Sequence, residues 1–137
     1  MSDAPTPSRG KRRPIWLLGA GAIAGLYAMA PAAVGRLSHL RRGVEVVDHV
    51  IPGLVVIALV GVATGGGAGS VGFMVVAGTV VCLAGLWMTA THVGLLEQAI
   101  HHQIGWNTAV YHCSTAALVV VLGVAWVWRY REALAEP

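Results

Sequence analysis

The sequence predicts an all-α integral membrane protein, a bundle of four transmembrane helices that run up, down, up and down. Of its 137 residues, 56% are hydrophobic and only 11% are charged. Its mean hydropathy is +0.71, and a soluble chain this short would have too little polar surface at that composition. Four apolar stretches are each long enough to cross about 30 Å of hydrocarbon. The lipid bilayer is therefore the expected solvent, and the chain has room for a single domain.

The four predicted spans cover residues 15–34, 44–64, 71–93 and 106–128, within a transmembrane domain of residues 14–131. Pro14 opens the first span, because a proline at a helix start lacks only an N–H that would have no partner there. A glycine-rich turn at 65–70 and a polar connection at 95–105 separate the later spans. Residues 1–13 are predicted to be a disordered cytoplasmic tail, and residues 132–137 a second cytoplasmic tail.

The orientation follows from the cationic residues beside the spans. One side carries Arg9, Lys11, Arg12, Arg13, Arg129 and Arg131, and the other carries Arg36, Arg41 and Arg42. Since cytoplasmic flanks hold the excess of Lys and Arg, both termini are predicted to be cytoplasmic. The abundance of Ala, Gly, Val and Arg, with one Lys and one Phe, favours a bacterial source. We therefore expect a multi-pass protein of the bacterial plasma membrane, and the placement of the basic residues at helix ends argues against a nucleic-acid partner.

Small residues predict where the helices approach closely. The first span repeats Ala20, Ala24, Ala28 and Ala32, beside Gly21 and Gly25. Such a stripe predicts bundle assembly, self-association or packing into a larger complex through the first helix. At helical spacing the third span aligns Gly78, Cys82, Gly85, Thr89 and His92, and the fourth aligns Thr108, His112, Thr115, Ala116 and Gly123. These faces are expected to point into the bundle, whereas Val80, Leu83, Leu86, Trp87 and Ala90 suit lipid.

Histidines and carboxylates gather at one end of the predicted bundle, the outward-facing one. They are His39, His49, His92, His101, His102 and His112, with Glu45, Asp48 and Glu97. His112 lies about two turns inside its span, and an ionisable residue there is costly, so it indicates a functional site. His49, His92 and His112 come from three helices at similar depth, and we predict that they form a binding site. His39, His101 and His102 are expected to be solvated loop residues.

Imidazoles at this depth suit haem b or a transition-metal ion such as Zn, Cu or Fe. In a cyclic bundle the second and fourth spans are diagonal, so His49 and His112 would be axial ligands on either side of a porphyrin, with His92 beside them. Electron transfer or redox chemistry with a redox partner would be the function. The chain has no Cys-x-x-Cys-His and no His-Glu-x-x-His motif that would specify the cofactor further.

Two other classes of function remain open, and the sequence does not decide whether the protein is an enzyme. In the first, Asp48, Glu97 or Glu45 is a general acid and a histidine is the base of a membrane-embedded enzyme acting on a lipid-soluble substrate. In the second, the protein is an accessory subunit of a larger membrane complex, and its histidines form interface hydrogen bonds.

Overall fold

The computed structural model describes residues 15–34, 46–65 and 70–135, and within them the side chains of all but 32–34 and 132–135. It contains the helix α1 (Ile15–Val34), a π-helical turn η1 (Val46–Val50) that continues into α3 (Ile51–Thr64), and the long helices α4 (Val71–Ile100) and α5 (Trp106–Ala135). The described chain is helical, which confirms the all-α bundle. His39, Glu45 and the predicted tail 1–13 lie outside the described residues, as do the cationic residues used for orientation between the first two helices.

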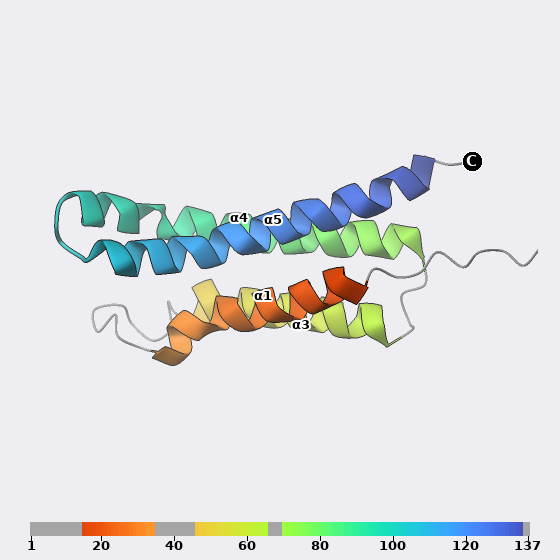
Figure 1. The fold of residues 1–137 in the computed structure, drawn as a ribbon, viewed down its shortest axis with the longest axis horizontal. Coiled ribbons are helices and arrows are strands. Elements are labelled where there is room, and N and C mark those ends of the chain that lie inside the picture. The colour runs from red at the N-terminus through yellow and green to blue at the C-terminus, as the bar shows by residue number, and fades with distance from the viewer. Residues whose placement is uncertain (1–14, 35–45, 66–69, 136–137) are drawn as a thin grey trace, which may run out of the picture.

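The helices form two antiparallel hairpins that lie side by side (Figure 1). The hairpin of α4 and α5 is the more extensively packed pair, and α1 packs on η1 and α3. The hairpins meet where α1 contacts α5 and where η1 and α3 contact α4. Each helix of the described chain thus has two neighbours, and α3 is diagonal to α5, as the cyclic arrangement predicts.

Glycines set the distance between α4 and α5. A Cβ atom added at Gly85 would lie 2.5 Å from the backbone nitrogen of Val120, and one at Gly123 would lie 2.4 Å from that of Cys82. Only glycine lets two backbones approach this closely. The predicted inward faces of both helices are confirmed for these glycines and for His92, His112 and Thr115, which are buried.

The small-residue stripe of α1 is used within the chain, where it packs against α3. Ala24 and Ala28 are buried. A Cβ atom at Gly25 would lie 2.7 Å from Cγ1 of Ile57 and 3.0 Å from the carbonyl oxygen of Gly53. The stripe therefore contributes to assembly of the bundle itself.

Among the described residues, three helical segments are long and apolar enough to cross a membrane: Val46–Thr64, Val71–Ile100 and the part Trp106–Arg131 of α5. The described apolar part of α1, Ile15–Pro31, is shorter and lies at the low end of the range of about 17–25 residues found in membrane-crossing helices. The surface agrees with a lipid environment, because all five residues predicted to face lipid on α4 are exposed: Val80, Leu83, Leu86, Trp87 and Ala90. Cys82 and Cys113 are both free thiols.

Two local predictions were wrong. The connection predicted at 95–105 is largely helical, because α4 continues to Ile100. Leu95 and Ala99 are buried against Ala109 of α5, so apolar contacts hold the extra turns in place. Thr89 was predicted on the inward face of α4 but is exposed, and Met88 is buried instead. The hydroxyl of Thr89 donates to the carbonyl of Gly85 one turn earlier, so this polar group has a hydrogen-bond partner although the side chain does not point into the bundle.

Candidate functional site

Three histidines converge where the two hairpins meet. His49 comes from η1, His92 from α4 and His112 from α5, and we call them the histidine trio. Their exposed fractions are 1%, 4% and 5%. One ring nitrogen from each lies within 4.8 Å of the other two. The structure therefore brings together the three residues that sequence depth and helical spacing had selected, and it places them in direct contact.

The local backbone explains how His49 reaches the other two rings. Pro52 stands at the start of α3, and it lacks the N–H that would bond to the carbonyl of Asp48 in a regular α-helix. The chain just before it winds as a π-helical turn, Val46–Val50. Such wide turns change the direction of side chains and are frequent at functional sites. Both Asp48 and His49 are buried there.

Two of the rings are oriented by backbone carbonyls. Nδ1 of His49 lies 3.2 Å from the carbonyl oxygen of Ala28. Nδ1 of His92 lies 2.6 Å from that of Met88, and 2.9 Å from the hydroxyl oxygen of Thr91. A carbonyl oxygen only accepts hydrogen bonds, so these two contacts are hydrogen bonds when the proton of each ring is on Nδ1. In a neutral ring the proton on Nδ1 leaves Nε2 with a bare lone pair.

The bare nitrogens face one another. Nε2 of His92 lies 2.8 Å from Nε2 of His49, and Nδ1 of His112 lies 3.1 Å from the same His49 atom. If all three rings are neutral and the two carbonyl bonds are kept, no proton stands between His49 and His92. Two lone pairs at hydrogen-bond distance repel, and burial strengthens the repulsion. With both carbonyl bonds kept, one additional cation in the histidine trio, either a proton or a metal ion, would relieve this repulsion.

The geometry suits a metal ion. Histidines that bind metals commonly donate their second ring N–H to a carbonyl or carboxylate, which fixes the tautomer and the ring orientation. His49 and His92 both do so. Ligand nitrogens about 2.0–2.1 Å from a tetrahedral metal are about 3.3–3.4 Å apart. The two short contacts of His49 need to lengthen by a few tenths of an ångström to reach that spacing. The third pair, between His92 and His112, lies within 4.8 Å and would have to close by up to about 1.4 Å.

A chain of aromatic contacts leads from His112 to α1. The ring centroid of Tyr111 lies 5.8 Å from that of His112 and 5.8 Å from that of Tyr27, both edge to face. The hydroxyl of Tyr27 lies 3.4 Å from that of Ser114. These contacts join α1 to α5 next to the histidine trio.

The other predicted site residues are not part of the convergence. Asp48 is buried one position before His49, but it is not among the three residues whose ligand atoms gather. Glu97, His101 and His102 are exposed at the end of α4 and in the turn after it. The carbonyls of Ala28 and Met88, which contact the His49 and His92 rings, were not predicted from the sequence. The contact with Met88 could have been predicted, since Met88 lies four residues before His92 on the same helix face.

Comparison with protein-family models, with curated proteins and with solved structures finds no match to this chain.

Proposed function

We propose that the histidine trio binds one transition-metal ion through Nε2 of His49, Nε2 of His92 and Nδ1 of His112. The observation that carries this proposal is the close approach of nitrogens that two backbone carbonyls leave without protons. An ion among them would convert the repulsion into three coordinate bonds. It would also bridge the two hairpins, because His49 belongs to one and the other two ligands to the second.

Imidazole ligands favour Zn, Cu or Fe over the hard cations Mg and Ca, which prefer oxygen. Three protein ligands leave a coordination position for water or a substrate, as in catalytic zinc sites. Redox chemistry and electron transfer with a partner would follow if the ion is Cu or Fe, since zinc does not change oxidation state.

Haem b is the second cofactor to consider, with His49 and His112 as axial ligands. In a six-coordinate haem the axial nitrogens lie on opposite faces of the porphyrin, about 4 Å apart if each bond is about 2 Å. Here the corresponding nitrogens are 3.1 Å apart, and the ring of His92 stands against the same His49 atom. Haem would require the helices to separate to admit the porphyrin, so a single ion needs the smaller rearrangement.

A proton is the alternative cation, and it would support the acid–base class of function. Asp48 is the better placed of the predicted catalytic carboxylates, because it is buried next to His49. Glu97 is exposed. A membrane-embedded enzyme acting on a lipid-soluble substrate would then use the histidine trio as its base and Asp48 as its acid.

The test is the metal content of protein purified in detergent without chelators. Elemental mass spectrometry measures the metal, and the absorption spectrum is recorded on the same sample. We expect about one equivalent of Zn, Cu or Fe per chain. His49→Ala, His92→Ala and His112→Ala should each lose most of it, whereas the exposed His101→Ala and His102→Ala should retain it. A Soret band would assign haem instead.

Circular dichroism and size-exclusion profiles establish which alanine variants remain folded. If wild-type protein carries no metal and takes up none of the three ions when they are added, the metal proposal is wrong. Loss of metal only in the His101 and His102 variants would contradict it as well, since it would place the ligands in the turn.

A further inference from the structure

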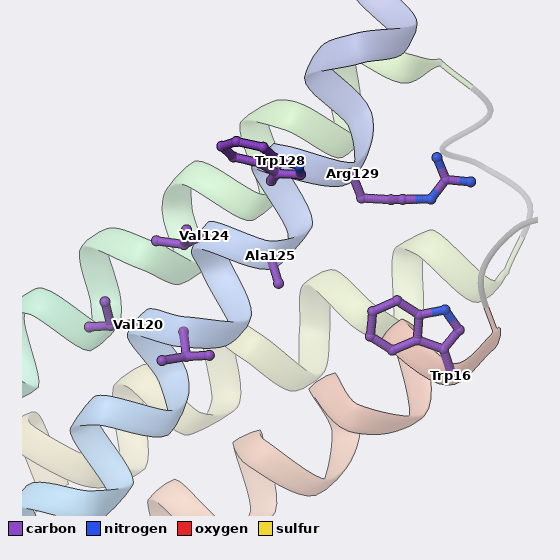
Figure 2. A pocket seen from close by; sticks show the side chains of 7 residues that line it. Trp16, Val120, Val124, Ala125, Trp128 and Arg129 are labelled. Atoms are coloured by element: carbon purple, nitrogen blue, oxygen red, sulfur yellow. The ribbon is translucent and has the colours of Figure 1, made fainter.

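A groove lies at the opposite end of the bundle from the histidine trio, between α1 and α5. Its volume is about 550 Å³, within the range of about 300–1,000 Å³ typical of ligand sites. Residues of α5 from Val120 to Arg129 line it, and Trp16 of α1 closes its other side. Figure 2 shows Ala125 between the two helices and Arg129 at the same end of the groove as Trp16.

The lining is apolar along its length and cationic at one end. Trp16, Val121 and Val124 are 64%, 63% and 50% exposed, so no described part of the chain covers them. Arg129 is the charged residue in the lining. An apolar surface in a membrane-spanning helix faces lipid, and an arginine at the end of the span lies at headgroup depth.

The length of the groove matches one leaflet of a bilayer. From Val120 to Arg129 the helix rises about 13 Å at 1.5 Å per residue. Half of a hydrocarbon core of about 30 Å is about 15 Å. Trp16 and Trp128 stand at the Arg129 end, as tryptophans do at the interface between lipid and water. The groove therefore runs from the interface to about the middle of the membrane.

We infer that this groove binds an anionic phospholipid, with an acyl chain along Val120, Val124 and Ala125 and the headgroup phosphate at Arg129. A guanidinium binds phosphate with charge-assisted, often bidentate hydrogen bonds. Nearby, the guanidinium of Arg131 lies 3.5 Å over the ring of Trp128 and is not part of the groove lining.

Native mass spectrometry of the full chain in detergent tests this with two lipids of identical acyl chains, phosphatidylglycerol and phosphatidylcholine. We expect wild-type protein to retain phosphatidylglycerol about five-fold better, the size of one interfacial arginine–phosphate attraction. Arg129→Gln should remove this preference. Arg131→Gln has the same change in charge but lies outside the groove lining, and it should keep most of the preference.

Filling the groove tests the apolar part separately. Ala125→Phe should reduce retention of both lipids, because the larger ring occupies the path of the acyl chain. Ala90→Phe makes the same change on the exposed face of α4 and should leave retention unchanged. Equal retention of the two lipids by wild-type protein would overturn the inference, as would equal losses in the Arg129 and Arg131 variants. A lipid-free dimer that Ala125→Phe dissociates would assign the groove to a second copy of the chain and would overturn it too.

Discussion

Nδ1 of His49 donates a hydrogen bond to the carbonyl oxygen of Ala28, 3.2 Å away. This bond links η1 to α1, and it decides which nitrogen of the ring faces His92 and His112. The orientation of the nitrogen that faces the other two rings therefore depends on a helix that contributes no histidine to the trio.

The first prediction concerns the tautomers of this site. We expect the rings of His49 and His92 to carry their proton on Nδ1, because each faces a backbone carbonyl through that atom. Long-range ¹H–¹⁵N correlation spectra of histidine-labelled protein distinguish the two tautomers, and the His49→Ala and His92→Ala spectra assign the signals. A proton on Nε2 of both rings would contradict the proposed coordination, since a protonated nitrogen does not bind a metal.

The second prediction concerns the contact between α1 and α3. Gly25→Leu should destabilise the protein by about 1–3 kcal/mol, because the new side chain would overlap Ile57 and the backbone of Gly53. Ala24→Leu, at a buried position on the same face, should act in the same direction. Gly19→Leu is the matched control, since a Cβ atom there meets nothing within 4 Å. Thermal unfolding in detergent measures the difference, and equal melting temperatures for the two glycine variants would show that this face is not tightly packed.

The third prediction concerns the contact between α4 and α5. Gly85→Ala and Gly123→Ala should each destabilise the protein, because the added Cβ atoms would meet backbone atoms, which cannot rotate away. Gly94→Ala should be neutral or stabilise it by up to about 1 kcal/mol, since alanine favours a helix and its Cβ meets nothing within 4 Å. The same melting experiment checks all three variants. A loss of stability for Gly94→Ala as large as for the other two would mean that backbone approach is not the cause.

The fourth prediction concerns orientation in the membrane. The asymmetry of Lys and Arg predicts that tags at either terminus are protected in intact cells, while a tag in the turn at 101–105 is reachable from outside. Protease or maleimide labelling before and after permeabilisation measures this. Labelling of the termini from outside would move the histidine trio to the cytoplasmic side.

The sequence predicted much of the fold because apolar length is a strong signal in a membrane protein. The inward placement of Gly85, Gly123 and His112 followed from helical spacing alone. The position where α4 ends could not be predicted in this way, because the polar residues Glu97 and Gln98 indicated a loop. They are instead the exposed face of a helix whose other face packs Leu95 and Ala99 against Ala109.

The site could be predicted in its membership but not in its geometry. Depth along the helices placed His49, His92 and His112 at one level. Depth does not give the rotation of η1, which depends on a π-helical turn before Pro52. It also does not give the tautomers, which depend on carbonyls from Ala28 and Met88. For the same reason the sequence favoured a porphyrin between His49 and His112, whereas the structure has these rings in direct contact.

The division of the histidine trio between two hairpins has a consequence for the order of folding. Helices of a membrane protein insert first and associate afterwards. The α4–α5 pair is joined by a short turn and already contains His92 and His112, so the proposed metal would find two of its three ligands in this hairpin alone. His49 arrives only when the second hairpin docks. Metal capture would then be the closing event of assembly, and its rate would report docking of the hairpins and not formation of the helices.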